Sequence, residues 1–355
     1  MPPTAMTLRR RVRRFLGRQR WITPRRVVNM ALVHLEMKLG RNQLWSRPYE
    51  LCIDVTNKCN LGCPYCPTGR KDPNERGRGN MPLETFRDIV DELGPTVRTL
   101  DLYNWGEPFF APELPLLIEH ASRKRILTTI SSNLSFRLPE ERVRAIVAAG
   151  LTNLTGAIDG ASQSVYETYR RGGRLDFALE NLRTFVRVRR EMGVEFPRLC
   201  WQFLVFKHNE HEVETARQMA AEIGVDTFAV SAGLYDDPSW APEGNYRLDY
   251  LSLHPNRCTW LWTKAVFHWD GGLASCCMGY NKHDDFDVWR KGQFREMWNN
   301  ERFAAARRIW TEPASPLPAD HYCVDCDKVR FYRGLPLHSR MKQVTSLEQQ
   351  AAASA

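Results

Sequence analysis

Residues 59–67 of this 355-residue chain read CNLGCPYCP, and the rest of the chain is organised around this stretch. Its cysteines, Cys59, Cys63 and Cys66, have a C-x3-C-x2-C spacing that can wrap one loop around a small inorganic group. Thiolates are soft ligands that suit iron–sulfur clusters and zinc. A four-iron cluster held by three cysteines has one iron without a protein ligand, and such an open position can bind a substrate. The alternative is a zinc knuckle that takes a distant fourth cysteine.

Short apolar segments and segments with helical periodicity alternate after residue 50. We expect strands at residues 51–55, 97–103, 126–130, 153–158, 199–206 and 225–230. We expect helices between them at residues 83–93, 114–123, 140–149, 175–192 and 210–223. Six strand–helix repeats predict a parallel sheet with right-handed crossovers. Because six repeats are too few for a closed eight-stranded barrel, the predicted fold class is α/β, with a partial (β/α)6 barrel.

Polar residues and glycines follow the expected strands on one side of the sheet. The carboxyl ends of parallel strands in such barrels lie on the same rim, where active sites are built. The cysteine stretch follows the first strand, and the next four are followed by 104–108 (NWGEP), 131–133 (SSN), 159–160 (DG) and 207–209 (KHN). We therefore expect these five loops to form one site.

These motifs resemble the radical S-adenosylmethionine (SAM) enzymes, in which a C-x3-C-x-aromatic-C stretch follows a strand. The resemblance implies a partial barrel in which the three cysteines bind a 4Fe–4S cluster and the open iron chelates SAM. A 5′-deoxyadenosyl radical then takes a hydrogen atom from the substrate. The SAM-binding residues that the resemblance implies are Tyr65, Gly106, Glu107, Pro108, Ser131, Asn133, Asp159 and Arg170.

Two positions depart from the family pattern. Trp105 stands where the family's Gly-Gly-Glu-Pro motif has its first glycine, and Ala157 stands where many members have a serine. Each rim motif also has a plain structural interpretation, because Gly, Pro, Ser and Asn favour turns and Arg170 can be a surface arginine.

The strand–helix pattern stops after residue 240, and the cysteines Cys258, Cys276, Cys323 and Cys326 follow. Their order resembles the SPASM domain, a cluster-binding extension of many radical SAM enzymes, in its shortened twitch form. The spacing is similar to that of the 2-deoxy-scyllo-inosamine dehydrogenases, which are aminocyclitol oxidases. The resemblance implies a second, auxiliary 4Fe–4S cluster. Four thiolates also make a good structural zinc site, and Cys277 is an alternative ligand.

The N-terminal arm is strongly basic. The first 35 residues carry nine arginines and no acid, which accounts for the net charge of +9. Because the rest of the chain is therefore near neutral, a protein that coats nucleic acid is not indicated. A helix is expected from Thr23 and Pro24, with an apolar stripe of Val28, Ala31, Leu32, Leu35 and Leu39. The arm and helix favour weak contact with an anionic membrane surface, or with an acidic partner or nucleic acid. The alternatives are a solvated tail with a helix packed on the main domain, or a transit peptide.

We expect four parts: an arm and helix (1–48), the partial barrel (49–240), the auxiliary cluster domain (241–332) and a tail (333–355). Clustered cysteines without an evident secretory signal predict metal ligands in a cytoplasmic protein. No apolar run is long enough to cross a bilayer.

The sequence thus predicts a radical SAM oxidoreductase. A fully ligated auxiliary cluster cannot chelate a substrate, so its expected role is electron transfer during a net oxidation. The main prediction is dehydrogenation of a small sugar-like or aminocyclitol substrate, with a flavodoxin- or ferredoxin-type reductant.

One alternative is a radical SAM enzyme that modifies peptides, a maturase or epimerase, although the arm is too short for the winged-helix domain that many of these carry. The other is a metal-binding or electron-carrier protein without catalysis. The catalytic base stays unassigned.

Overall fold

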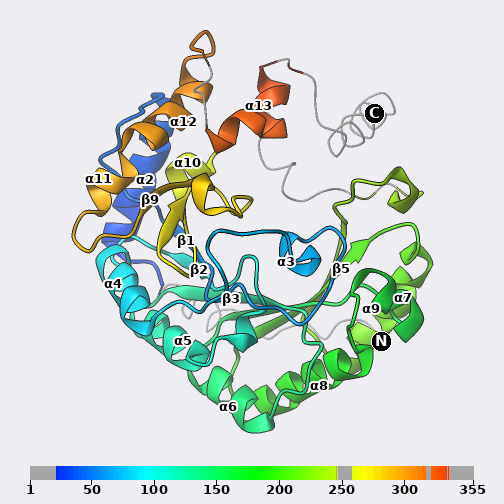
Figure 1. Cartoon of the computed structure of the whole chain (residues 1–355). Coiled ribbons are helices and arrows are strands. Elements are labelled where there is room, and N and C mark those ends of the chain that lie inside the picture. The colour runs from blue at the N-terminus through cyan, green and yellow to red at the C-terminus, as the bar shows by residue number, and fades with distance from the viewer. Residues whose placement is uncertain (1–20, 245, 247–257, 317–320, 334, 336–355) are drawn as a thin grey trace, which may run out of the picture.

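The structure is a computed structural model that describes residues 21–244, 246, 258–316, 321–333 and 335 (Figure 1). The basic arm and most of the expected tail lie outside the described residues. Among the residues that are described, no helix combines the length and apolarity that crossing a membrane requires.

A nine-stranded sheet lies at the centre of the molecule, in the order β6-β5-β4-β3-β2-β1-β7-β8-β9. The six expected strands are confirmed, and each pairs in parallel with the next along the chain. They are β1 (Glu50–Ile53), β2 (Thr99–Asp101), β3 (Leu127–Ser132), β4 (Asn153–Ala157), β5 (Arg198–Val205) and β6 (Thr227–Ala232). Their carboxyl ends therefore lie on one rim, as the expected site requires.

Helices cover the outer face of the parallel strands, where Figure 1 shows α4, α5, α6 and α8 side by side. The connecting helices are α4 (Leu83–Leu93), α5 (Leu114–Arg123), α6 (Glu140–Ala148), α7 (Gln163–Tyr169), α8 (Leu175–Glu191) and α9 (Val213–Ile223). In α4 the buried residues Phe86, Ile89, Val90 and Leu93 recur at helical spacing. They join the strands' outward side chains in one core, so burial of this stripe holds the helix on the sheet.

The C-terminal cysteine-rich part continues this sheet. β7 (Lys264–Phe267) pairs in parallel with β1, so that Leu51 lies opposite Ala265. β8 (Gly272–Ala274) and β9 (Asp285–Val288) follow as antiparallel strands. The helices of this part are α10 (Trp260–Thr263), α11 (Phe294–Trp298), α12 (Glu301–Thr311) and α13 (Asp327–Tyr332). The expected boundaries at 48, 240 and 332 stay predictions, but the barrel and the C-terminal part share one sheet.

The N-terminal helix α2 (Pro24–Lys38) forms as expected, with the Thr23 side chain accepting a hydrogen bond from the backbone N–H of Arg26. It is packed on the main domain, but the stripe does not make the contact. The helix buries Arg26, Asn29, Val33 and Glu36, while most of the apolar stripe is exposed. A stripe at helical spacing is a poor guide here because the polar side chains form the tertiary contacts.

Candidate cluster and cofactor site

The cysteine loop begins after β1 and ends where Cys66 forms the N-terminal cap position of α3 (Pro67–Arg70). The Gly62 N–H donates a hydrogen bond to the Arg171 carbonyl at 2.9 Å, which ties the loop to the segment after α7. On its other side, Gly69 packs against the backbone of Cys63, where a Cβ atom at position 69 would lie 2.5 Å from the Cys63 oxygen. Both contacts fix the path of the cysteine loop without using the three thiols.

The three thiols lie in one apolar group. Cys63 is buried with Leu61, Tyr169 and Phe206, and the other two cysteines of the loop are packed against this group. Burial raises the pKa of the Cys59 thiol to about 12 and also raises the pKa of Cys63, and neighbouring thiols add to both effects. Thiols with such pKa values become thiolates when a cationic metal group binds them.

In the described ranges, no three His, Cys, Asp or Glu side chains surround a point where a single metal ion could sit. The chemistry of the donor set is nevertheless that of an iron–sulfur centre, three thiols on one loop in an apolar setting. The residues present therefore fit a cluster with thiolate ligands.

A buried ion pair lies beside Cys63. The Arg170 Nε donates to Asp159 Oδ2 at 2.6 Å, and Arg170 Nη1 lies 4.0 Å from the Cys63 sulfur. The other oxygen of Asp159 accepts the Leu204 N–H at 2.7 Å. Burial raises the pKa of the Asp159 carboxyl, and the adjacent Arg170 guanidinium opposes this rise. The structure thus places these two predicted residues together, next to the cysteine loop.

Glu107 connects the loops after β2 and β3. One carboxylate oxygen accepts from the Ser132 hydroxyl at 2.7 Å, and the other accepts from the Asn133 backbone N–H at 2.8 Å. Its backbone N–H donates to the Lys58 carbonyl at 2.8 Å. Pro108 begins the short helix η1 (Pro108–Phe110), which Glu107 caps. Both oxygens of Glu107 are therefore engaged inside the protein.

Ser131 and Ser132 lie on opposite faces of β3, because side chains alternate along a strand. Ser132 is buried and bonded to Glu107, whereas Ser131 is half-buried on the other face. The predicted Ser131 thus remains available to a ligand, and the sequence did not reveal that its neighbour has the structural role.

Asn133 joins the same network to the cysteine loop. Its side-chain N–H2 donates to Asn60 Oδ1 at 3.0 Å and lies 3.8 Å from the Cys59 sulfur. Asn60 in turn donates to the Ser135 carbonyl at 2.9 Å. Sequence reasoning missed Asn60, although its place directly after the first cysteine of the motif is a signal that could have found it.

Gly106 allows the loop after β2 to lie directly on the start of the cysteine loop. A Cβ atom at position 106 would lie 1.9 Å from the Thr56 carbonyl oxygen. Asp54, at the end of β1, is 1% exposed and accepts backbone N–H groups of Trp105 and Gly106. Gly106, which the family resemblance places among the SAM-binding residues, makes this close approach to the protein backbone. Asp54 is a second site residue that the sequence did not reveal.

Aromatic side chains form one wall of the site. Tyr65, the aromatic residue of the motif, meets Trp240 edge-on at 5.2 Å between ring centroids. Trp240 ends η3 (Pro238–Trp240) and also packs edge-on against Phe206 at 5.5 Å, while Phe206 lies 4.4 Å from Tyr169. Such a surface suits a planar, apolar ligand group. Trp240 was missed because it follows the last repeat without a motif around it.

The C-terminal cysteines come together from distant segments. Cys258 precedes α10, Cys276 follows β8, Cys323 lies in η5 (Tyr322–Asp325) and Cys326 precedes α13. Burial raises the pKa of all four thiols. The thiols of Cys258 and Cys326 raise the pKa of Cys323 further, and those of Cys323 and Cys326 raise that of Cys276. This mutual influence indicates one buried group of thiols, which fits a metal cluster. The thiol of Cys277, the next residue in the chain, also raises the pKa of Cys276.

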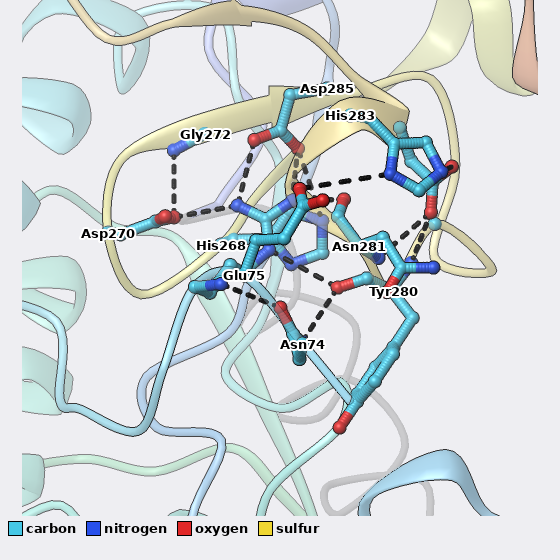
Figure 2. A network of polar contacts seen from close by, with 12 residues as sticks. Asn74, Glu75, His268, Asp270, Gly272, Tyr280, Asn281, His283 and Asp285 are labelled. Carbon is cyan, nitrogen blue, oxygen red and sulfur yellow. Dashed lines mark hydrogen bonds and ion pairs between the residues drawn. The ribbon is translucent and has the colours of Figure 1, made fainter. Parts of the chain in front are cut away.

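Arg76 joins the loop after α3 to the C-terminal part, and Figure 2 labels its partners Asp270, Asn281 and Asp285. Its guanidinium donates to Asp270 at 2.8 Å, to both oxygens of Asp285 at 2.8 and 2.6 Å, and to the Asn281 carbonyl at 2.7 Å. The guanidinium and both carboxylates come from segments about 200 residues apart, and Arg76 is buried. The network therefore holds the two cysteine sites in a fixed relation.

Trp105 makes a second connection. Its indole N–H donates to the Gly279 carbonyl at 2.8 Å, and its ring lies edge-on to Tyr280 at 5.5 Å. The residue that departs from the family motif thus reaches the loop that follows Cys276.

Known proteins resemble the chain over both parts. It is 27% identical to the mycofactocin maturase MftC of Mycobacterium tuberculosis over 336 residues, 82% of this chain and 81% of MftC. It is 23% identical over 321 residues to the tungsten-containing aldehyde ferredoxin oxidoreductase cofactor-modifying protein of Pyrococcus furiosus, 78% of this chain and 86% of that one. It is 22% identical over 245 residues to the PqqA peptide cyclase of Bradyrhizobium diazoefficiens, 68% of this chain and 60% of the cyclase.

The fold is also found in the crystal structure of Streptococcus suis SuiB bound to S-adenosylmethionine. That structure matches with a TM-score of 0.59 at 15% identity, covering 85% of this chain and 75% of SuiB. Residues 53–220 match the radical SAM superfamily, and residues 258–327 match SPASM, an iron–sulfur cluster-binding domain. These domains imply a 4Fe–4S cluster with SAM and an auxiliary iron–sulfur centre. The cysteine loop after β1 thus lies in a radical SAM domain, and the C-terminal cysteines lie in a SPASM domain.

Proposed function

We propose that this radical SAM enzyme modifies a peptide substrate. The observation that carries the proposal is the alignment with a maturase over about four fifths of both chains, to which a peptide cyclase adds a shorter match. The sequence-based preference for a sugar-like substrate rests mainly on the spacing of the auxiliary cysteines. A match over most of the chain outweighs this spacing.

In this proposal, Cys59, Cys63 and Cys66 hold the catalytic cluster. When bound, the cluster and SAM supply a 5′-deoxyadenosyl radical that removes a hydrogen atom from the substrate. The Nε of Arg170 donates to Asp159, while its terminal Nη1 group lies beside Cys63, where it can donate to the SAM carboxylate. The aromatic wall of Tyr65 and Trp240 receives the flat adenine ring.

Ser131 and Asn133 are the proposed ribose partners, since hydroxyl and amide groups pair well with hydroxyls. Glu107 acts on SAM through Asn133, because both of its oxygens are engaged by protein groups. Gly106 and Pro108 give the loop its path against Thr56. These roles make Glu107 a positioning residue.

The proposed ligands of the auxiliary cluster are Cys258, Cys276, Cys323 and Cys326. A cluster held there would supply an acceptor for the electron of the substrate radical, so that loss of one hydrogen atom, one electron and one proton would give a net two-electron oxidation. The catalytic cluster must also receive an electron, and a flavodoxin- or ferredoxin-type protein is the proposed donor.

The test measures hydrogen transfer. Reduced enzyme is incubated anaerobically with SAM and a deuterated peptide, taken from a short reading frame beside the gene, or with deuterated aminocyclitols. Deuterium in 5′-deoxyadenosine from the peptide supports the proposal. Deuterium from an aminocyclitol and none from the peptide would favour the second candidate, dehydrogenation of a sugar-like substrate, which the auxiliary cysteine spacing supports.

Cysteine substitutions test the two metal sites. We expect about eight irons per reconstituted chain, as two four-iron clusters. Replacing Cys59, Cys63 and Cys66 with alanine leaves roughly half of this iron and abolishes SAM cleavage. Replacing Cys323 and Cys326 with alanine removes the other half and spares SAM cleavage. Continued 5′-deoxyadenosine formation by the first variant, or zinc in the second site after anaerobic purification, contradicts the assignment.

A further inference from the structure

We propose that the outward face of α2 docks the protein on an anionic lipid surface. The proposal rests on two independent observations, the orientation of the helix in the structure and the charge of the first residues in the sequence. It concerns a part of the molecule that lies away from the cysteine loop.

The orientation of α2 is set by its polar residues. The Arg26 guanidinium donates to the backbone carbonyls of Trp21, Gly94, Lys124 and Arg125, which include the ends of α4 and α5. A cation at these helix ends is also favoured by their dipoles. The helix is thus attached to the domain by its polar face, which in most amphipathic surface helices faces the solvent.

Two more polar residues hold the same face. Asn29 exchanges hydrogen bonds with the backbone of Arg47, at 3.0 and 2.8 Å. Glu36 accepts from the Trp45 N–H at 2.8 Å and from the Ser46 hydroxyl at 2.5 Å. These contacts fix the rotation of the helix about its axis, so the apolar stripe cannot turn inward without breaking them.

The outward face is therefore apolar. Val28 is 67% exposed, Leu35 52% and Leu39 63%, and they follow one another at helical spacing. Trp45, beside the end of the helix, is 64% exposed, with the Arg41 guanidinium 4.3 Å from its ring centroid. A line of apolar side chains with a tryptophan at its end is the pattern of a helix that lies in a membrane interface.

The charge around this face is positive. Arg25 and Lys38 are exposed, while Glu36, the only acid in α2, is 1% exposed. The 20 residues before the described part of the chain contain seven arginines and no acid. Each cation close to an anionic lipid surface adds about 1 kcal/mol of attraction. Exposed Glu296 lines the same pocket as Trp45, but the exposed charges of α2 itself are all basic, which matches an anionic bilayer better than an uncharged surface.

The experiment uses the full chain and vesicles. Cosedimentation is measured with phosphatidylcholine vesicles and with mixed phosphatidylcholine–phosphatidylglycerol vesicles, at low and high salt. We expect binding to the mixed vesicles only, and weaker binding at high salt because exposed charges are screened. Val28→Asp and Leu35→Asp should each lower the partition coefficient about tenfold or more, since each removes one buried apolar side chain from the contact.

Leu116→Asp is the matched control, because Leu116 on α5 is 44% exposed and lies outside the proposed face. It should bind vesicles like the unchanged protein. All variants should keep their iron and their rate of SAM cleavage, which shows that the fold and the cysteine loop are intact. The vesicle measurement needs no substrate, so it stands or falls separately from the proposed peptide chemistry.

Three outcomes overturn the proposal. The first is that Leu35→Asp binds vesicles as tightly as the unchanged protein, and the second is that phosphatidylcholine alone binds the protein as well as the anionic mixture does. The third is a dimer in analytical ultracentrifugation that Leu35→Asp dissociates while vesicle binding is absent, which makes the face an interface between two copies of this chain.

Discussion

Asp54 is a single carboxyl group on which the geometry of the rim depends. It lies at the end of β1, accepts the N–H groups of Trp105 and Gly106, and leaves its Oδ1 without a hydrogen-bond partner. Burial raises its pKa to about 8, with the loop's N–H groups opposing the rise. The protein is therefore expected to hold this group as a neutral acid near neutral pH.

The pH dependence of stability follows from this shift. A carboxyl whose folded pKa is raised from 3.8 to about 8 contributes full stability below the lower value, and loses it as pH rises to the upper one. Asp54→Asn keeps an acceptor for the loop and cannot ionise. We expect the variant's thermal midpoint to fall less than that of the unchanged protein between the two pKa values. A parallel decline in both proteins, measured by circular dichroism, would show that Asp54 is not buried as described.

Motifs located most of the rim residues but did not reveal their partners. The Gly-Glu-Pro and Ser-Ser-Asn loops were recognisable because each departs from strand and helix periodicity. The bonds from Glu107 to Ser132 and Asn133 were not predictable, because they join loops 25 and 26 residues apart and depend on the register of β2 against β3. Asn60 and Asp54 carry no pattern of their own, since their roles come from neighbours that only the fold supplies.

At the scale of whole elements, the position of the short helix α3 depends on close backbone packing. Gly69 of this helix lies so close to Cys63 that a Cβ atom would be 2.5 Å from its oxygen and 2.6 Å from its nitrogen. Gly69→Ala should push α3 away from the cysteine loop and lower the iron bound there. A Cβ at Gly62, in the loop itself, meets nothing closer than 3.7 Å. Gly62→Ala is thus the control that keeps its iron, and equal iron in both variants contradicts the packing described here.

The network at Arg76 belongs to the same scale, because it joins one loop to a hairpin. Arg76→Ala leaves Asp270 and Asp285 without their cation, and loss of one partner from a buried pair costs about 3–5 kcal/mol. We expect denaturant unfolding to show a loss of this order. Arg78→Ala, at an exposed position two residues away, should change stability by less than about 0.5 kcal/mol. Similar effects from the two substitutions would mean that the network contributes little.

Element positions were predictable where apolar periodicity is strong, as in α4 and α5, whose predicted limits match the structure. The strands β1, β2 and β4 are shorter than predicted, because the pairing that defines a strand stops before its apolar residues do. The face of α2 was not predictable, because its apolar stripe marks the exposed side and Arg26, Asn29 and Glu36 find partners far along the chain.

At the scale of the whole molecule, the sequence led us to expect a partial barrel and a separate small domain. The α/β class and the two families are confirmed. What the sequence could not show is that β7 extends the parallel sheet beside β1. β7 has four residues, and its partner β1 lies more than 200 residues earlier, so no local sequence pattern predicts the pairing. Because the two parts share one sheet, the two cysteine sites have little freedom to move apart.

Trp105 gives the last prediction, since it joins the rim of the first site to the loop beside the second. Trp105→Gly, which restores the family's glycine, removes the hydrogen bond to Gly279 and the ring contact with Tyr280. Hydrogen exchange of residues 276–281 should become about tenfold faster or more, because a hydrogen bond and an aromatic pair each contribute about 1 kcal/mol. Trp105→Phe keeps a ring and loses the donor, so its exchange should be intermediate. Unchanged exchange in Trp105→Gly would mean that the shared sheet and Arg76 alone hold the two sites together.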